Sequence, residues 1–273
     1  MGINISVIRS GSSGNCTALW TKNECVLIDC GHVRVSELEY ELNQLGISCN
    51  NIRGIIVTHA HSDHIDTNGL KFALAYGIKV YIHPENYEIV YSNNQRVIKQ
   101  LEANMQIAFH RLAPFKIGVY RIEPFRVKHP KHNPGYPLGF ALSVKRVEGN
   151  VKFGYMTDLK EVTPEILEKL AGVSALIIET NYDQTVIDNG YGQHGWDAHL
   201  SNQRAARAVC DLSCASSPSQ LRYVFLAHVS DRNNTHEDAW DCVTRVLHLR
   251  GVEGIELVRT HRYKRSRVIT VQA

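Results

Sequence analysis

Residues 55–66 constrain this chain more than any other stretch of its sequence. They read IIVTHAHSDHID, a β-branched and apolar run that passes directly into His59, His61, Asp63 and His64. The apolar half predicts a buried strand, and the polar half predicts a loop at the end of that strand. Four imidazole and carboxylate side chains within six positions exceed what a turn requires, so we expect this loop to bind metal.

The composition is that of a globular protein with a sizeable core: 273 residues, 44% hydrophobic and 21% charged. No run of about 18 apolar residues predicts a transmembrane helix, and no export signal is evident at the N-terminus. Seven scattered cysteines without a CxxC pair favour a reduced, cytoplasmic protein. A net charge of +3 is too small to indicate nucleic acid by itself, whereas fourteen histidines strengthen the case for metal.

Strand and helix patterns alternate along the chain, which predicts a layered α/β architecture. Residues 36–45 have apolar side chains at helical spacing, with Ser36 as the expected N-cap and Gly46 as the stop. Residues 84–104 read as a polar helix, residues 182–198 as a long loop, and the tail as a hairpin or a terminal strand. Without a linker or repeat, residues 1–273 are expected to form a single domain with two similar β-rich halves.

Further candidate ligands follow predicted strands elsewhere in the chain. Asp29 ends CVLID, Asp158 follows GYMT, and His228 ends FLAH. His129 ends the strand FRVKH, and His132, three residues later, is the alternative ligand or a substrate contact. Side chains at strand ends can converge on one edge of a sheet, so these residues are expected to join the motif loop. The donors suit zinc, manganese or iron, and the lack of clustered cysteines argues against a structural zinc knot.

Spacing inside the motif allows one loop to serve two metal ions. His59 and His61 are two positions apart and lie on the same side of an extended segment, whereas the adjacent Asp63 and His64 point in different directions. Two metal ions activate water and stabilise both the attacking and the leaving oxygen, which is hydrolytic chemistry.

THAHSDH resembles the HxHxDH signature of the metallo-β-lactamase superfamily, and the ordered Asp29, His129, Asp158 and His228 match its other motifs. The resemblance implies a four-layer αβ/βα sandwich with two facing mixed β-sheets. It also implies that His59, His61 and His129 hold one divalent ion. Asp63, His64 and His228 would hold the second, and Asp158 would bridge them. Asp29 would accept a hydrogen bond that orients a ligand.

Glu179, at the end of ALIIE, and His199, in AHLSN, resemble motifs of the phosphodiesterase branch of this superfamily. Cleavage of a phosphodiester requires a proton for a poor alkoxide leaving group, and a histidine paired with a carboxylate can supply it. The other interpretation is a helix-capping segment in which Ser201 or Asn202 is the cap.

GSSGNCTAL, HLSN and LAHVSDRNNT resemble motifs of the YycJ/WalJ-like proteins of that branch. That resemblance implies a DNA exonuclease in which a metal-bridging hydroxide attacks the phosphodiester, with Asp63, His199 and Glu179 as catalytic residues. The implied substrate-binding residues are Ser12, Ser13, Asn15, His132, Asn233 and Asn234. SGSSGN is also typical of a simple hairpin turn.

Other substrates and contacts stay open. A cyclic-nucleotide phosphodiesterase would use the same residues, whereas an ester, thioester or lactam hydrolase of this fold would not need His199. The basic run RTHRYKRSR could follow a phosphate backbone or be a solvated strand. Tyr182, Tyr191 and Trp196 could stack on bases or pack their own loop. The expected partner is a nucleic acid or nucleotide, with no membrane, and a homodimer is a further option.

Overall fold

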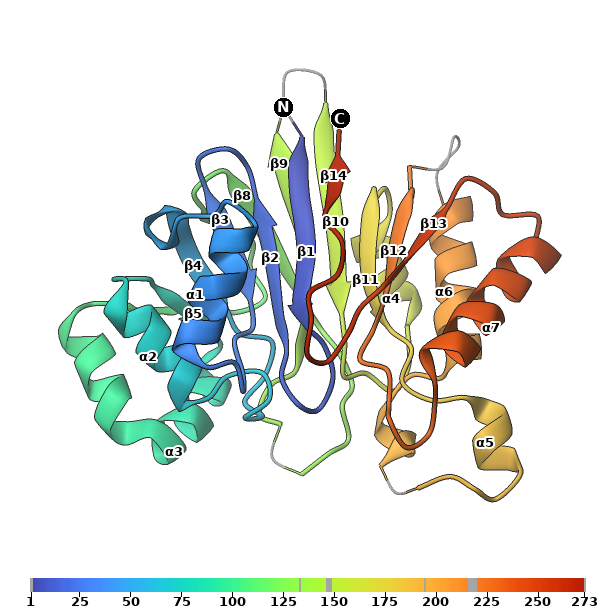
Figure 1. The fold of residues 1–273 in the computed structure, drawn as a ribbon, viewed down its shortest axis with the longest axis horizontal. Helices are drawn as coiled ribbons and strands as arrows, with labels where there is room; N and C mark the ends of the chain where they lie inside the picture. The colour runs from blue at the N-terminus through green and yellow to red at the C-terminus, as the bar shows by residue number, and fades with distance from the viewer. Residues whose placement is uncertain (1, 133, 146–148, 194, 216–219, 273) are drawn as a thin grey trace. The chain divides into compact units, whose positions relative to one another are not determined.

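The computed structural model describes residues 2–132, 134–145, 149–193, 195–215 and 220–272. The chain divides into two compact units. The first consists of Met1–Ile122, His132–Pro137 and His261–Ala273, and the second of Glu123–Lys131 and Leu138–Thr260. The predicted α/β class is confirmed, because the chain forms two seven-stranded sheets that carry helices (Figure 1).

The first sheet is mixed. In spatial order its strands are β14 (Ile269–Val271), β1 (Ile3–Arg9), β2 (Cys16–Trp20), β3 (Cys25–Ile28), β4 (Ile52–Ile56), β5 (Val80–Ile82) and β6 (Ile107–Phe109). From β3 to β6 the strands run parallel. The helices of the first unit are α1 (Val35–Gln44), η1 (Cys49–Asn51), α2 (Thr67–Ala75) and α3 (Pro84–Ala103). Apolar side chains of β2–β5 and of these helices form one buried core, which explains the nearly continuous apolar runs of the strands.

The second sheet repeats this plan. Its strands are β13 (Glu256–Arg259), β12 (Tyr223–Ala227), β11 (Ala175–Glu179), β10 (Asn150–Met156), β9 (Leu138–Lys145), β8 (Tyr120–Arg126) and β7 (Phe115–Ile117). From β10 to β13 the strands run parallel. The helices are α4 (Pro164–Leu170), α5 (Gln184–Asp188), η2 (Trp196–Ala198), α6 (Asn202–Cys214) and α7 (His236–Leu249). α6 packs on both α4 and α7, and the apolar faces of these helices build the second core (Figure 1).

Parallel strands bring the candidate residues to one edge within each unit. Because β3 and β4 are parallel, Asp29 and Thr58 follow the same edge of the first sheet. Because β10, β11 and β12 are parallel, Asp158, Glu179 and His228 meet at one edge of the second sheet. Convergence of strand-end side chains is therefore a consequence of strand direction within each unit.

Three of these strand-end residues adopt left-handed backbone conformations: Asp29 (φ 58°), Asp158 (φ 56°) and His228 (φ 52°). For a residue with a side chain this conformation costs on the order of 1–3 kcal/mol and persists only where the surroundings enforce it. Both sheets thus use the same strained exit from a strand to direct a polar side chain along the edge.

Several sequence expectations need correction. Ser36 is not the cap of α1: the helix begins one residue earlier, and Arg34, in an extended conformation, is its N-cap without a side-chain hydrogen bond. The expected loop over residues 182–198 contains α5 and η2. The tail supplies strands to both sheets, β13 and β14, so the terminal-strand expectation holds and the hairpin does not. Among the described residues, no helix is long and apolar enough to cross a membrane.

Candidate metal centre

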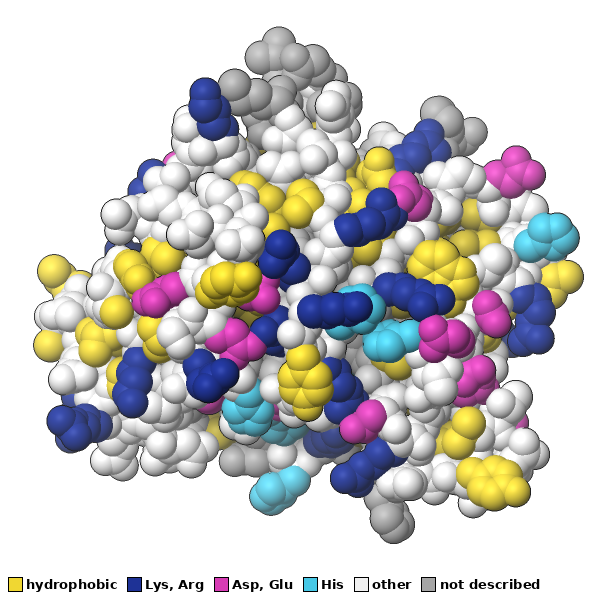
Figure 2. Space-filling view, viewed as in Figure 1, with side chains coloured by type: hydrophobic (Ala, Val, Ile, Leu, Met, Phe, Trp, Pro, Cys, Tyr) yellow, Lys and Arg dark blue, Asp and Glu magenta, His cyan; other side chains and the backbone are white. Residues whose placement is uncertain are grey.

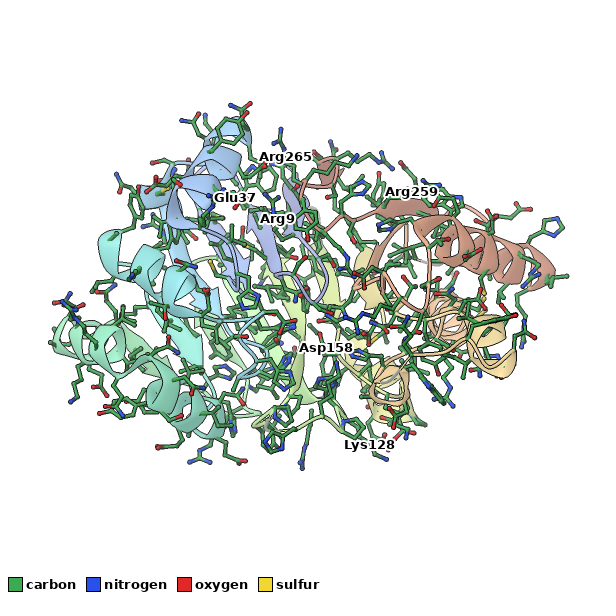
Figure 3. The ribbon with its side chains drawn as sticks, turned by 60° about the horizontal axis from the view of Figure 1, so that its bottom comes forward. Arg9, Glu37, Lys128, Asp158, Arg259 and Arg265 are labelled. Carbon is green, nitrogen blue, oxygen red and sulfur yellow. The ribbon has the colours of Figure 1, made fainter. Side chains whose placement is uncertain are left out.

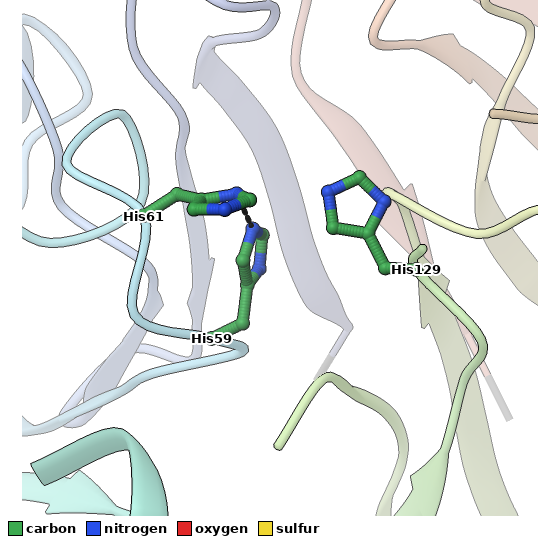
Figure 4. A group of neighbouring side chains, drawn as sticks. All are labelled: His59, His61 and His129. Atoms are coloured by element: carbon green, nitrogen blue, oxygen red, sulfur yellow. Dashed lines mark hydrogen bonds between the residues drawn. The ribbon is translucent and has the colours of Figure 1, made fainter. Parts of the chain in front are cut away.

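In the first unit the rings of His59 and His61 turn two nitrogens toward one point. His59 Nε2 lies 2.9 Å from His61 Nδ1 (Figure 4). Two nitrogen ligands of a tetrahedral zinc ion, each 2.0–2.1 Å from the metal, are about 3.3 Å apart. The separation in the structure is close to that value, so these two atoms fit a shared metal ion.

Asp29 organises the base of this loop. Its carboxylate is wholly buried and accepts hydrogen bonds from Thr58 N at 2.8 Å, Thr58 Oγ1 at 2.8 Å and His64 Nδ1 at 2.7 Å. Burial raises the pKa of Asp29, although His64 and Thr58 act in the opposite direction. The predicted orienting role of Asp29 therefore has a clear geometric basis: it directs Nε2 of His64 away from the sheet edge.

Thr58 is a residue that the sequence reasoning missed. Since its hydroxyl donates to Asp29, it accepts from His59 Nδ1, 3.0 Å away. This network assigns the proton of His59 to Nδ1 and the lone pair to Nε2, the atom that faces His61. The signal was present in VTH, because a hydroxyl directly before the first ligand can reach that ligand's ring.

Asn15 contacts the same loop through hydrogen bonds of its backbone and its side chain. It is buried, its backbone N donates to Asp63 O at 2.8 Å, and its Nδ2 lies 3.3 Å from Asp63 Oδ2 and 3.0 Å from His64 Nε2. Its Oδ1 accepts from Gly11 N at 2.9 Å, which closes the 11–15 turn. SGSSGN is therefore a turn, as the simpler interpretation had it, and the turn also holds Asp63. Ser12 is exposed and Ser13 is half-buried.

His132 contacts the ligand loop through its backbone. Its carbonyl oxygen lies 3.1 Å from His61 Nε2. A carbonyl only accepts, so His61 carries its proton on Nε2 and directs its Nδ1 lone pair toward His59. The side chain of His132 is exposed.

In the second unit one carboxylate holds two imidazoles. Glu179 is wholly buried, and its Oε1 accepts from His199 Nδ1 at 2.6 Å and His228 Nδ1 at 3.0 Å. Its Oε2 accepts from the backbone N of Leu159 at 3.0 Å and of Leu200 at 3.3 Å. Burial acts to raise the pKa of Glu179, but the charge of His199 and the hydrogen bonds from both histidines outweigh it and hold the pKa at about 2. The sequence paired Glu179 with His199 alone and missed His228.

Asp158, Glu179, His199 and His228 form a compact group whose donor atoms all lie within 4.8 Å of one another. Asp158 Oδ1 is 3.5 Å from His228 Nε2 and 3.8 Å from His129 Nε2, so one carboxylate oxygen faces two imidazoles (Figure 3 labels Asp158). His129 Nδ1 lies 3.3 Å from Ala198 O, which places its lone pair on Nε2. Burial lowers the pKa of His129 to about 4, which keeps the ring neutral, as a ligand must be.

The donor chemistry of both units fits divalent metal ions. Across the two units, buried imidazoles have one ring nitrogen fixed by an acceptor and the other directed away, which is the usual arrangement of metal-binding histidines. Each unit also has a carboxylate beside its imidazoles, Asp63 in the first and Asp158 in the second, and nitrogen and oxygen donors together suit zinc, manganese or iron. Each unit carries only part of the predicted ligand set.

The segment around His199 contains the expected helix cap, at Ser201, and a histidine–carboxylate hydrogen bond. α6 begins at Asn202, and Ser201 is its N-cap, accepting from Arg204 N at 3.3 Å. His199 lies two residues before this cap, in an extended conformation, and turns its ring to Glu179. One segment therefore contains both the N-cap of α6 and, two residues earlier, the histidine that pairs with Glu179.

Asn233 and Asn234 have structural partners. Asn233 bonds to the backbone N and O of Gln193 at 2.8 and 3.1 Å, and Asn234 Nδ2 donates to Thr180 O at 2.9 Å. Asn181, missed in the sequence, donates to His228 O at 2.9 Å and thereby holds the strained residue. These amides fix the loop that follows His228.

Two side chains of the predicted basic run, Arg259 and Arg265, form ion pairs. Within the first unit Arg265 pairs with Glu41 at 2.6 Å, and Arg9 pairs with Glu37 (Figure 3). Arg259, in the second unit, pairs with Glu237 at 2.8 Å and lies over Trp240. The face drawn in Figure 2 accordingly shows basic and acidic side chains intermixed. Of the three aromatic residues of the 182–198 segment, Tyr182 and Trp196 pack edge to face, while Tyr191 is exposed.

Comparison with known proteins agrees with this geometry. A family model described as "Beta-lactamase superfamily domain" matches residues 24–228. Exodeoxyribonuclease YycJ of Bacillus anthracis is 27% identical over 260 residues, covering 92% of this chain and 91% of that protein. Exodeoxyribonuclease WalJ of Streptococcus pneumoniae serotype 2 is 24% identical over 248 residues, covering 87% and 85%.

A solved structure bears out the predicted fold. The metallo-β-lactamase fold protein YhfI of Bacillus subtilis superposes with a TM-score of 0.70 at 16% identity, over 99% of this chain and all of that one. At this identity the likeness shows the fold alone, and the family follows from the sequence match. The chain belongs to the metallo-β-lactamase superfamily, in its YycJ/WalJ-like branch, and is a metal-dependent hydrolase.

Proposed function

We propose that this chain is a two-metal phosphodiesterase that degrades DNA from an end. The observation that carries the proposal is the buried pair of His199 and Glu179, 2.6 Å apart at the same strand edge as Asp158 and His228. A histidine held in this way can deliver a proton to an alkoxide. The similarity to YycJ and WalJ, which are named exodeoxyribonucleases, supports DNA as the substrate.

The proposed metal ligands come from both units. His59 Nε2, His61 Nδ1 and His129 Nε2 would hold one ion, and Asp63, His64 Nε2 and His228 Nε2 the other, with Asp158 shared. In each ring the other nitrogen faces a hydrogen-bond acceptor, which puts the lone pair on the nitrogen named. The lone pair of His64 Nε2 faces Asn15 Nδ2 at 3.0 Å, so a metal ion would take the place of that contact. Because neither unit supplies all of the proposed metal ligands, we propose that residues 1–273 function as one domain. The metals would be zinc or manganese, with iron as a third option.

When bound, two divalent ions lower the pKa of a water molecule and stabilise negative charge on the phosphoryl oxygens. The chain's own residues then supply the proton. Glu179, with a pKa of about 2, stays ionised and holds Nδ1 of His199. His199 can therefore carry a proton on Nε2 and give it to the departing sugar oxygen. Asp63, whose Oδ2 accepts a hydrogen bond from Asn15 Nδ2, is proposed as both ligand and catalytic residue.

Substrate contacts are proposed for Ser12, Ser13 and the side chain of His132. Ser12 and His132 are exposed, and Ser13 Oγ has no hydrogen-bond partner within the described part of the chain. Asn15, Asn233 and Asn234 have all been given structural partners above, so we propose that they shape the loops around the substrate. We also propose that the protein works in the reducing cytoplasm, where its seven free cysteines would stay reduced.

The proposal is tested by comparing substrates whose leaving groups differ. Purified protein, reconstituted separately with zinc and with manganese, would be assayed on end-labelled DNA, a panel of cyclic nucleotides and bis-p-nitrophenyl phosphate. We expect progressive loss of DNA from an end. His199→Ala should lower the rate on DNA by about 10²–10⁴-fold. The same change should cost far less on bis-p-nitrophenyl phosphate, since nitrophenolate leaves without a proton.

Two variants frame this comparison. Asp63→Ala should lower the rates on all phosphodiesters together, whereas His248→Ala, a change at the exposed end of α7, should alter none. Turnover of cyclic nucleotides with DNA left intact would replace the DNA assignment by the cyclic-nucleotide one. Absence of phosphodiester cleavage with either metal would overturn the proposal and favour esters, thioesters or lactams.

A further inference from the structure

Asn86, in the first turn of α3, joins two segments of the first unit. It is wholly buried. Its Nδ2 donates to Thr58 O at 3.3 Å and to Tyr136 O at 3.1 Å, and its Oδ1 accepts from Tyr136 N at 2.6 Å. One amide thus uses its acceptor and its donors to fasten Tyr136 to the residue directly before His59.

The described residues of this segment, 132 and 134–137, reach the ligand loop at two further points. Pro134 O accepts from Ala60 N at 3.1 Å, and His132 O lies 3.1 Å from His61 Nε2. The ring of Tyr136 stacks on His83, with ring centroids 4.2 Å apart. Gly135 passes so close to Asn86 that a Cβ added there would lie 2.3 Å from its Oδ1.

We propose that Asn86 is a positioning residue for the metal ligand His61. By fixing Tyr136 it helps to place the His132 carbonyl, which accepts the Nε2 proton of His61 and sets its Nδ1 as the ligating atom. The inference rests on the proposed metal site, in which His61 is a ligand. It assigns a function to a segment whose only sequence-predicted member was His132.

The physical reason is that a histidine ring needs a partner on its second nitrogen to hold one tautomer and one orientation. His59 and His64 obtain theirs from Thr58 and Asp29, which extend directly from the sheet. His61 instead depends on a backbone carbonyl in a connecting segment. The position of that carbonyl depends on the segment that carries it. Asn86 anchors this segment at Tyr136, and the bond from Ala60 N anchors it at Pro134.

Two variants disturb the contact between Asn86 and the segment that contains Gly135 and Tyr136, each by changing one of the two partners. Asn86→Ala removes the amide, and Gly135→Ala inserts a Cβ against it. Gly77→Ala is a matched control for the second, because Gly77 has a similar φ, +66° against +73°, and no atom within 4 Å of the added Cβ. Asn94→Ala, on the same helix, is the control for the first: Asn94 donates to Val90 O and accepts from Thr67 Oγ1, and so has a comparable pair of side-chain bonds away from Tyr136.

Zinc affinity of each full-length variant would be measured by competition with a chromophoric chelator, beside a thermal melt. Histidine tautomers in the zinc-bound protein would be read from long-range ¹H–¹⁵N spectra. We expect Asn86→Ala and Gly135→Ala each to weaken zinc binding by about 10–100-fold and to change the His61 signals. The two controls should bind as wild type. In a His61→Ala background, Asn86→Ala should add little further loss, because its effect passes through His61.

Three outcomes separate the ideas. Variants that melt earlier but bind zinc as wild type, with unchanged His61 signals, would show a purely structural role and overturn the inference. Wild-type protein that binds no zinc would instead overturn the metal site itself. If Asn86→Ala fails to fold, the comparison of Gly135→Ala with Gly77→Ala decides.

Discussion

Two buried carboxylates, one in each unit, accept hydrogen bonds from imidazoles, but they differ in the number of groups that donate to them. Asp29 follows β3 and accepts from one histidine, His64, and from Thr58. Glu179 ends β11 and accepts from two histidines and two backbone amides. Burial, the largest influence on each, raises the pKa of Asp29. At Glu179 the histidines outweigh burial and bring the pKa to about 2.

This difference shows how two similar sheet edges divide the work. In the proposed site the first edge would only orient ligands, and Asp29, Thr58 and a backbone carbonyl would share that task. The second edge would orient the proposed ligand His228 and also prepare the proposed proton donor His199, both through the single carboxylate of Glu179. Loss of Glu179 should therefore be more damaging than loss of Asp29.

Glu179→Gln is the change with the largest expected effect. The amide keeps one acceptor oxygen but cannot stabilise a charged His199, so we expect the rate on DNA to fall by about 10³–10⁴-fold. Steady-state assays with matched metal loading would measure it. If the rate fell no further than it does in Asp29→Asn, the conclusion that loss of Glu179 is more damaging than loss of Asp29 would be wrong.

Acid is expected to weaken both units of the metal-free protein. Burial lowers the pKa of His129, in the second unit, and of His110, in the first, to about 4. Such a histidine has a lower pKa in the folded than in the unfolded protein. Its contribution to stability is complete at pH values above the pKa of the unfolded state, about 6.5. That stability is lost as the pH falls from 6.5 toward 4, on the order of 3 kcal/mol for each residue.

Urea denaturation of chelator-treated protein at several pH values would measure this loss. His129→Asn and His110→Asn should each flatten the acid slope, since each removes one titrating ring. A slope unchanged by both would mean that other groups dominate acid unfolding. Chelation is essential, because bound metal also favours neutral imidazole.

Asp29→Asn should have a smaller effect than Glu179→Gln, and mainly on binding. The new amide group would meet a donor, either Thr58 or His64, so we expect metal affinity to fall by about 10–100-fold. The free energy of unfolding should fall by about 1–3 kcal/mol for the unsatisfied buried group. Isothermal titration with zinc and denaturant melts would separate the two. The ratio of the rates on DNA and on bis-p-nitrophenyl phosphate should stay unchanged in this variant, because His199 lies in the other cluster.

How far the sequence predicts these two edges depends on whether their residues are contiguous. Most of the first cluster lies in one stretch of sequence, so the pattern THAHSDH was sufficient to predict that His59, His61, Asp63 and His64 lie close together. The second assembles from four strand ends and a loop. Strand endings predicted Asp158, Glu179 and His228, yet nothing local indicated that Glu179 would also bind His228.

The remaining gaps have definite physical causes. Side-chain bonds from Thr58, Asn181 and Asn86 depend on which residues the fold brings together, and single residues of these types carry no pattern. Ser36 is a good N-cap by type, but α1 begins one residue earlier and makes no use of it. The left-handed conformations of Asp29, Asp158 and His228 are imposed by their surroundings, so propensity does not reveal them.

The smallest effect concerns the helices that follow the two clusters. In each unit a cap lies two residues after a key histidine: Asp66 after His64, and Ser201 after His199. Asp66 accepts from two backbone amides, Asn68 N and Gly69 N, both at 3.0 Å, and its charge suits a helix N-terminus. Ser201 accepts from one, at 3.3 Å.

We therefore expect Asp66→Ala to cost about 1–2 kcal/mol of unfolding free energy and Ser201→Ala about 0.5–1 kcal/mol. Denaturant melts of the two variants, beside Thr235→Ala as the N-cap of another helix, α7, would measure this. Equal costs would mean that charge and the second bond add nothing at Asp66. If Ser201→Ala also changed the rate on DNA while Thr235→Ala did not, the cap of α6 would contribute to the placement of His199, and the second cluster would depend on its helix as well as on Glu179.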